Sequence, residues 1–387
     1  LSAAVSLNSV GINISRAIGP ALAGLLIVSV GVAAPFALNF ISTLGIIAVL
    51  VWWRPAQAEQ STLPTEHILG AMWTGLRFAR HSSELGHTLV RAVGFFLFAS
   101  AYWTMLPLIA REVLQGGAQL YGLLMGSVGA GAVLGAVIMP KLRQKLGPDW
   151  MVALGTIGTA LVLVVFAVVP NQIAALIAAA CAGASWIAVL STLNVSAQVA
   201  LPNWVRARGL SIFLMVFFGT MAAGSIIWGQ LAGIAGIPVS MLIAAAGLVL
   251  AIPLTWRFKL GSGAEIDFTP SMHWPAPPVE LDQADYKRSV TITVQYRVAP
   301  DNRQAFLNLM QQLKRVRQRH GGYGWQILQE PGQADMVTEI WSERSWAEHL
   351  RHHERVSVTD KELQDRIAAL LSDGAKPVVT HLMPAIL

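Results

Sequence analysis

Long apolar stretches separated by short polar connections occupy the first two thirds of the chain. Stretches without a charged residue cover 17–53, 92–110, 113–140, 150–205 and 209–256. A helix needs about 20 apolar residues to cross the hydrocarbon core of a bilayer, and glycine or proline near the middle of a longer stretch marks a turn. Divided in this way, the stretches predict eight membrane spans, at 10–32, 35–53, 90–110, 118–140, 150–169, 172–198, 209–231 and 237–256.

Basic residues give these spans an orientation. Alternate connections carry ten Lys and Arg residues in all, whereas the connections on the opposite side carry only Arg111. Lys and Arg concentrate on the cytoplasmic side of membrane proteins. We therefore expect a multi-pass protein of the plasma (inner) membrane in which the 54–89 connection and everything after the last span are cytoplasmic.

The 54–89 connection is the longest in this region and has a helical pattern of its own. Its apolar positions are Ile68, Met72, Trp73, Leu76 and Phe78. Their spacing predicts a helix, either an amphipathic one that lies on the cytoplasmic membrane surface or an ordinary linker helix.

Composition separates this region from the remainder of the 387-residue chain. Charged residues make up only 12% of the whole; residues 1–256 hold 11 Lys and Arg against 5 Asp and Glu, and the remaining residues hold 16 of each. The basic excess therefore lies between apolar stretches and not on a water-exposed domain, which argues against a nucleic-acid partner. A single cysteine, Cys181, excludes a disulfide framework and a cysteine metal cluster.

The last third predicts a linker at 258–287 and a small domain at 288–387. Apolar and polar residues alternate over 290–298 as in a half-buried strand, and a helical pattern follows up to Gly321. A strand hairpin, two short helices and a last strand at 377–383 complete the pattern. The order of strand, helix, two strands, two helices and strand predicts a ferredoxin-like α+β domain.

Aromatic and histidine residues are the candidate functional groups of this domain. His349 and His353 are four positions apart on a predicted helix and can share a metal ion, but the sequence shows no third ligand, so we expect no metal. Contact with a ligand or a heme in a cleft, and a structural or surface role, remain alternatives, also for the neighbouring His352. Trp325 and Trp341 are candidates for a pocket with His349 and His353, with ordinary core packing as the alternative.

Small residues recur every fourth position in the first predicted span, a spacing that allows close helix approach. The motif residues there are Ser15, Arg16, Gly19, Pro20 and Gly24. Arg16 can snorkel to the interface, pair with an acidic residue or line a pathway. The stretch resembles the export-associated motif C in the fifth helix of major facilitator superfamily transporters, although Ser15 and Ala23 replace glycines of that pattern.

Further segments extend the resemblance over essentially the whole chain. They read LNSVGINISRAIGPALAGLL, GLRFAR, LPNWVRARGLS and WAEHLRHHERV. Together they resemble the transmembrane secretion effectors, a branch that includes enterobactin-exporter-like proteins. The last domain resembles the dimeric α+β barrel domains of the antibiotic-biosynthesis-monooxygenase type in its fold pattern.

The resemblance implies an all-α membrane protein with the major facilitator fold, of which residues 1–257 supply helices five to twelve. Because the chain begins at Leu1, we expect four further helices upstream. It implies a secondary active, proton-coupled exporter of a siderophore, drug or metabolite, without a cofactor and not an enzyme. The expected partners are the lipid bilayer, the transported molecule and a second copy through the last domain. The alternative is a membrane-anchored oxygenase-like enzyme or a ligand sensor acting through that domain.

Polar and aromatic groups near the middle of the spans are candidates for the substrate pathway, since transporters of this kind bind substrate near the membrane midplane. These candidates are Asn39, Tyr102, Trp103, Trp186 and Asn194. Hydrogen bonding to a neighbouring helix is the alternative role for an isolated polar residue.

Overall fold

The computed structural model describes residues 30, 33–53, 68–261, 267–274, 285–333, 335–372 and 375–385. The chain divides into two compact units. A helical unit comprises Leu1–Gln60, Thr88–Ser196 and Met215–Leu260, and a C-terminal unit comprises Ser61–His87, Ala197–Leu214 and Gly261–Leu387. The C-terminal unit therefore includes short segments from within the membrane region of the sequence as well as the tail domain, residues 285–385.

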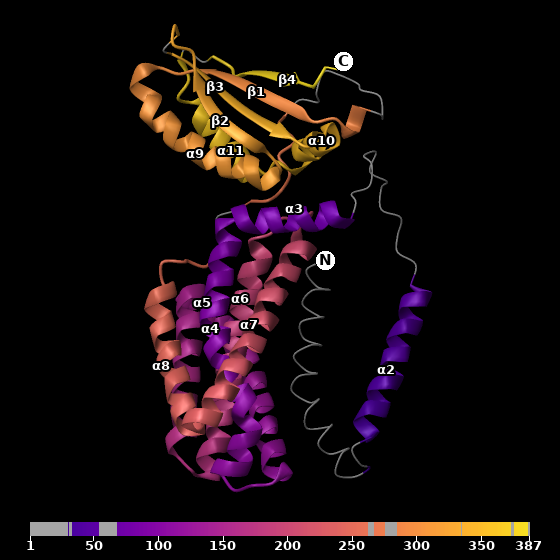
Figure 1. Cartoon of the computed structure of the whole chain (residues 1–387), viewed down its shortest axis with the longest axis vertical. Coiled ribbons are helices and arrows are strands. Elements are labelled where there is room, and N and C mark those ends of the chain that lie inside the picture. Colours follow the sequence, from indigo (N-terminus) through magenta and orange to yellow (C-terminus); the bar gives the residue numbers. More distant parts are fainter. Residues whose placement is uncertain are drawn as a thin grey trace. The chain divides into compact units, whose positions relative to one another are not determined.

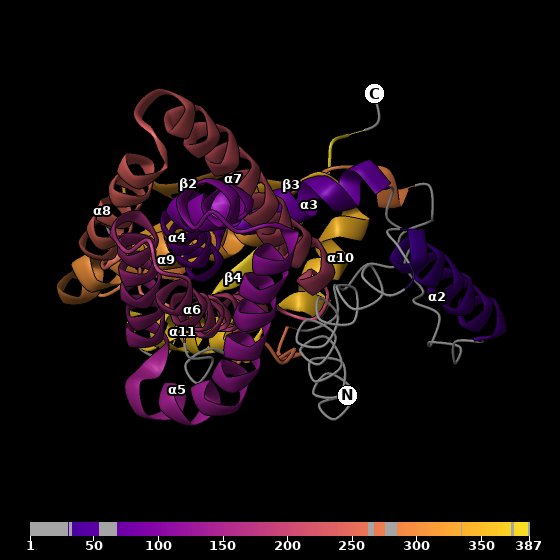
Figure 2. The same cartoon turned by 90° about the horizontal axis from the view of Figure 1, so that it is seen from below.

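Long apolar helices form the helical unit, and several run nearly side by side (Figure 1). They are α2 (Ala33–Trp52), α4 (Ser83–Leu108) with a π-helical turn at Ile109–Val113, α5 (Ala118–Val168), α6 (Gln172–Val199), α7 (Arg206–Ala235) and α8 (Ile237–Thr255). Figure 2 shows the same helices from below, with α7 inclined to the viewing direction. Helix α5 contains two of the predicted spans. Gly147, with φ of 77°, interrupts the helical conformation between them.

Six stretches of the described chain are long and apolar enough to cross a membrane. They are Ser83–Val113, Ala118–Met139, Lys141–Val168, Gln172–Val199, Arg206–Ala235 and Ile237–Thr255, and a shorter apolar helix covers Phe36–Trp52. Each predicted span from 35–53 onward thus falls on a helix. The predicted span 10–32 lies outside the described residues apart from Val30, and so do Ser15, Arg16, Gly19, Pro20 and Gly24 of the motif.

Glycines let α5 and α6 approach closely. A Cβ atom on Gly131 would overlap the backbone carbonyl of Ala180, and one on Gly183 would overlap that of Val128. By contrast, Gly122 and Gly126 on the same stretch of α5 have no atom within 4 Å of such a Cβ. Only part of the glycine-rich sequence therefore serves helix packing.

The tail domain is a four-stranded antiparallel sheet with helices packed on one face (Figure 1). Its elements follow the predicted order: β1 (Val290–Arg297), α9 (Arg303–His320), β2 (Tyr323–Gln329), β3 (Met336–Glu343), α10 (Trp346–Arg355), α11 (Val358–Ala368) and β4 (Val378–Leu382). The sheet order is β2-β3-β1-β4, so β1 and β3 are central and β4 is an edge strand.

The alternation of β1 and the apolar face of α9 build the core of this domain. Val290, Ile292, Val294 and Tyr296 are buried on the helix-covered face of β1, opposite Phe306, Leu309, Met310 and Leu313 of α9. Helix α9 ends at Gly321, whose φ of 126° is a conformation that favours glycine. Without a Cβ atom, the chain can turn there from α9 directly into β2.

Helix α3 (Ile68–His81) occupies the predicted helix of the 54–89 connection, but its apolar residues do not share one face. Phe78 is buried and meets the Trp204 ring edge-on at 5.7 Å, whereas Met72, Trp73 and Leu76 are exposed. In the same unit Arg77 forms an ion pair of 2.9 Å with Glu348 of α10. One face of α3 thus packs on protein, a role that its sequence pattern did not predict.

Candidate functional site

An aromatic cluster brings together three of the predicted pathway residues. The ring of Tyr102 on α4 lies 5.1 Å from Trp103 and 6.0 Å from Trp186 on α6, and Trp103 lies 5.4 Å from Trp186. Phe96 and Phe217 extend the cluster, at 5.4 Å and 6.3 Å from Trp186. Helices α4, α6 and α7 therefore contribute to one aromatic surface inside the helical unit.

This cluster also contains buried polar groups. Tyr102 is fully buried, Trp103 is half-buried, and among the described residues the Tyr102 hydroxyl and the Trp103 indole N–H find no hydrogen-bond partner outside this pair. Buried polar groups are usually satisfied. The cluster therefore combines aromatic faces with hydrogen-bonding capacity that the surrounding helices leave unused.

The two predicted asparagines lie apart from these ring contacts. Asn39 is exposed on α2, and its backbone carbonyl accepts hydrogen bonds from Ser42 and Thr43. Asn194 is half-buried on α6, about two helical turns beyond Trp186.

The helical unit contains a buried ion pair that the sequence did not predict. Arg91 of α4 is almost fully buried and donates a hydrogen bond of 2.9 Å to Asp149, which follows the Gly147 break in α5. Arg91 also donates to the backbone carbonyl of Asp149. Both residues were missed because each lies at the border of an apolar stretch, where a charge looks like part of a connection.

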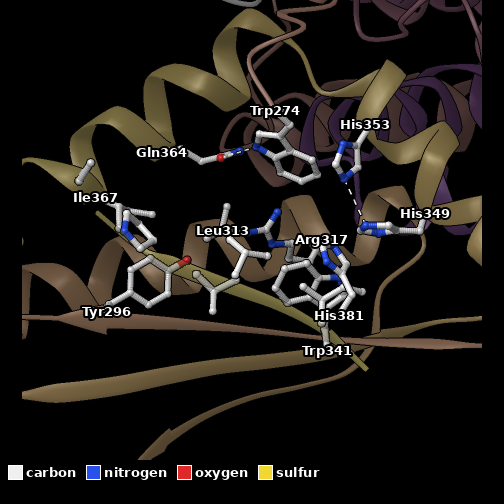
Figure 3. A pocket seen from close by; sticks show the side chains of 15 residues that line it. Trp274, Tyr296, Leu313, Arg317, Trp341, His349, His353, Gln364, Ile367 and His381 are labelled. Carbon is white, nitrogen blue, oxygen red and sulfur yellow. Dashed lines mark hydrogen bonds between the residues drawn. The ribbon is translucent and has the colours of Figure 1, made fainter. Parts of the chain in front are cut away.

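A cavity of about 380 Å³ lies between the sheet and the helices of the tail domain (Figure 3). Its lining residues come from β1, β3, β4, α9, α10 and α11 and from the segments before β1 and β4. They are Trp274, Ile292, Val294, Tyr296, Leu313, Arg317, Trp341, His349, His353, Gln364, Ile367, Ala368, Pro377, Val379 and His381. Three of the four predicted pocket residues line this cavity. The fourth, Trp325, does not line it and instead donates its indole N–H to Glu339 at 2.9 Å.

A buried ion pair, Arg317 with Glu339, lies at the wall of this cavity. The Arg317 guanidinium donates to both Glu339 carboxylate oxygens, at 3.1 and 3.3 Å, and the Tyr296 hydroxyl donates to Glu339 at 2.8 Å. Burial by itself would lower the pKa of Arg317, but the Glu339 carboxylate raises that pKa above its ordinary value. Burial and the Glu339 charge raise the pKa of Tyr296. Arg317 therefore keeps its positive charge at the cavity wall, where Glu339 pairs with it.

Glu343 at the end of β3 orients two histidines of α10. It is fully buried and accepts hydrogen bonds from His349 Nδ1 at 3.1 Å, His352 Nδ1 at 2.8 Å and the Trp341 indole N–H at 3.0 Å. Burial alone would raise the pKa of Glu343, but His352 and His349 hold it well below its ordinary value. Because an ionised carboxylate only accepts hydrogen bonds, both Nδ1 atoms must carry the proton.

A third histidine joins the predicted pair. One ring nitrogen of each of His349, His353 and His381 lies within 4.8 Å of the others. His381 is on β4, 28 positions after His353 in the sequence, so the helical spacing that singled out His349 and His353 could not reveal it. The antiparallel pairing of β4 with β1 thus supplies, near the end of α10, a third imidazole that the sequence spacing did not show.

Burial keeps several of these imidazoles uncharged at neutral pH. Burial, together with the neighbouring His349, His352 and His381, lowers the pKa of His353 to about 3. His320 stacks on His352 at 4.7 Å, and burial lowers its pKa to about 3 although Asp360 opposes the shift. Burial also lowers the pKa of His381, so His353 and His381 at the cavity wall are uncharged at neutral pH.

Comparison with known proteins places the whole chain in one family. The model of the transmembrane secretion effectors, a family of the major facilitator superfamily, matches residues 1–386. The chain belongs to the transmembrane secretion effector family. Together with the apolar helices, this membership makes it a multi-pass inner-membrane protein.

The chain is also similar to curated proteins that are named as exporters. The enterobactin exporters EntS of Escherichia coli O1:K1 and of Shigella flexneri are each 28% identical over 186 residues, which make up 47% of this chain and 42% of the relative. The chain thus spans less than half the length of the curated relatives it matches. Among solved structures, a bacterial homologue of the human lysosomal transporter Spinster, in an inward-facing conformation, gives a TM-score of 0.43 at 15% identity, covering 67% of this chain and 72% of that one.

Proposed function

We propose that this protein is a secondary active transporter that exports small molecules, with proton antiport as the driving reaction. The observation that carries the proposal is the family match over residues 1–386, which covers both the apolar helices and the tail domain. Family membership favours a transporter over a membrane-anchored oxygenase-like enzyme. Because the EntS relatives are named for enterobactin, siderophores are the first cargo class to test.

The aromatic cluster of Tyr102, Trp103 and Trp186 is the proposed substrate contact. Aromatic faces bind flat organic molecules by stacking, and the Tyr102 hydroxyl and Trp103 N–H can orient such a molecule by hydrogen bonds. Asn39 and Asn194 stay candidates for the substrate pathway. The Ser15–Gly24 motif stays a candidate for the close helix contact about which the two halves of the transporter move.

Efflux from cells lacking the gene tests both parts of this proposal. Restoring the full-length gene should restore export of at least one siderophore or drug, and a protonophore should abolish it. Trp186→Phe and Tyr102→Phe should reduce export at normal protein abundance, because they remove aromatic area and a hydroxyl from the cluster.

Trp150→Phe is the matched control, since Trp150 is an exposed tryptophan that packs edge-on against Trp256. If the restored wild-type gene gives efflux and the Trp186→Phe and Tyr102→Phe proteins export as well as the wild type, the cluster is rejected as the substrate contact. The transport proposal then still stands. Absence of efflux for every compound tested with the restored gene would reject transport itself.

For the tail domain we propose a cytoplasmic location, a ferredoxin-like fold of the monooxygenase-like dimeric type and self-association. The sheet order and antiparallel pairing support the fold, and exposed apolar residues on the edge strands, such as Leu328, Val378 and Leu382, support self-association. A cysteine at Gly332, in a Cys181→Ser background, should resist an impermeant thiol reagent in intact cells. Ready labelling would reverse the topology, and a monomeric sedimentation profile would reject the dimer.

Ligand sensing by the tail domain is the second candidate function, and the cavity of about 380 Å³ favours it. A volume of this size suits a small organic molecule. If the cavity senses cargo, Ile292→Trp should fill it and change the concentration dependence of efflux, while maximal export by the helical unit persists.

A further inference from the structure

The three-histidine cluster has the donor atoms and spacing of a metal site. His353 Nε2 lies 3.2 Å from His349 Nε2. Two imidazole nitrogens bound to one tetrahedral zinc ion are about 3.3 Å apart, given Zn–N distances of about 2.0–2.1 Å. The third imidazole, His381, has a ring nitrogen within 4.8 Å of the other two and lies at a half-exposed position of an edge strand.

A buried carboxylate orients the first of these ligands. Glu343 accepts the Nδ1 proton of His349, which leaves the Nε2 lone pair directed towards His353. Metal-binding histidines commonly donate their second ring nitrogen to such a carboxylate, which fixes the tautomer and raises the basicity of the ligand. Glu343 is itself held by Trp341 and His352, so its position does not depend on a metal ion.

The charge and shape of the surroundings suit a cation with an open coordination position. The nearest cationic group of the cavity wall, Arg317, is paired with Glu339, so Glu343 leaves a net negative charge beside the imidazoles. His349, His353 and His381 all line the cavity (Figure 3). A metal ion with three protein ligands would therefore have its fourth position open to the cavity, as in zinc sites that bind water or a small ligand.

We propose that His349, His353 and His381 bind one divalent first-row transition-metal ion, with zinc as the reference ion, and that Glu343 is the positioning residue for His349. Imidazole ligands suit zinc, copper, nickel and iron more than calcium or magnesium. The site does not depend on whether the helical unit transports a solute.

Metal binding to the full-length protein in detergent tests this site. After removal of metal with a chelator, the protein should bind one Zn²⁺ per chain, measured by mass spectrometry of the metal and by competition with a chromophoric chelator. Co²⁺ should give the intense visible absorption of a four-coordinate site. His353→Gln and His381→Gln should each weaken binding more than about 100-fold, because a lost ligand costs more than a lost outer-shell partner.

Two further variants separate the site from other effects. Glu343→Gln should keep one equivalent at saturation but weaken binding about 10- to 100-fold. His273→Gln is the matched control and should bind as the wild type does, since His273 hydrogen-bonds Ser271 and Gln364 outside the cluster.

The variants are compared only where hydrogen exchange of β1 and β3 shows an intact tail domain. His381→Gln, on the edge strand, is the variant least expected to disturb it. The proposal is overturned if the wild-type protein binds no zinc, or if the His381→Gln protein, with its tail domain folded, binds zinc as tightly as the wild type.

Discussion

The helical unit and the tail domain bury polar groups in opposite ways. Among the described residues, the fully buried polar side chains of the helical unit are hydroxyls, with Arg91 as the exception: Thr88, Ser100, Thr156, Thr159, Thr192, Ser196 and Ser240. The tail domain instead buries ionisable groups: Arg317, His320, Glu339, Glu343, His349, His352 and Asp360.

The difference follows from where each side chain finds its partner. Thr156, Thr159 and Thr192 donate to the backbone carbonyl four residues earlier, so these three hydroxyls are satisfied within their own helices. Glu339 and Glu343 receive donors from other strands and helices. A helix that enters lipid must be internally satisfied, whereas a domain in water can assemble a charged network as it folds.

Acidification should produce the largest difference in stability between the two units. His320 and His353 have folded pKa values of about 3, below the ordinary value, so the unfolded chain binds protons first as the pH falls. The free energy of unfolding of the tail domain should therefore be greatest above pH 6.5 and decrease from there towards pH 3. Near and below pH 4, protonation of Glu343 and Asp360, whose pKa values are lowered, adds to the loss.

Calorimetry of the detergent-solubilised protein between pH 7 and 4 measures this effect. The transition of the tail domain should move to lower temperature while that of the helical unit stays. A helical unit that is equally acid-sensitive would remove the contrast.

Arg317→Met should destabilise the tail domain by about 3–5 kcal/mol, because it leaves Glu339 charged and buried without its cation. Arg315, two positions earlier, is exposed, and Arg315→Met should change stability little. Hydrogen exchange of β3 amides in the full chain reads out both variants. A small loss for Arg317→Met would mean that Tyr296 and Trp325 suffice to hold the Glu339 carboxylate.

Arg91→Met tests the exception in the helical unit. Asp149 would lose its charged donor but keep the Leu260 backbone N–H, and its side chain is partly exposed. The expected loss is about 1.5–3 kcal/mol, that of a hydrogen bond to a charged group. Thermal unfolding in detergent measures it, with the exposed Arg111→Met as control. A loss as large as that of Arg317→Met would contradict the proposed difference between the units.

Gly131→Val tests packing without charge. Its side chain would meet the Ala180 carbonyl across the α5–α6 contact, and overpacking costs about 1–3 kcal/mol. Gly126→Val introduces the same residue into the same helix at an open position, so it corrects for helix propensity. Equal thermal stability of the two variants would show that the close approach of α5 and α6 is not required.

The contact of α3 with α10 should give the smallest effect. Arg77 and Glu348 are mostly buried but near solvent, with side chains 12% and 16% exposed. A double-mutant cycle of Arg77→Met and Glu348→Gln should give a coupling of about 0.2–1 kcal/mol, typical of pairs with access to water. Hydrogen exchange of α10 amides provides the measurement, and the same cycle in high salt should give a smaller coupling. Coupling above this range would make the pair part of the buried network.

Local patterns were sufficient to predict the elements. Apolar stretches of about 20 residues predicted the helices from residue 35 onward, because length and hydropathy alone determine whether a helix can cross lipid. Alternation over 290–298 predicted β1, and Gly321 predicted the end of α9, since each depends on neighbouring residues only. The helix at 68–81 was predicted as well, but which of its faces would pack was not.

The candidate sites were only partly accessible to such reasoning. Tyr102 and Trp103 are adjacent in sequence, yet their contact with Trp186 depends on how α4 packs against α6. Arg91 and Asp149 looked like ordinary border charges until the tertiary structure paired them.

The sequence by itself determined which segments are helices and strands and that two histidines share one face of α10. Only the tertiary structure decided that His381 joins them, that Glu343 orients them and that a cavity opens beside them. The physical reason is range: hydrophobic periodicity acts between residues a few positions apart, whereas strand pairing brings His381 to His349 and His353 from 32 and 28 positions away.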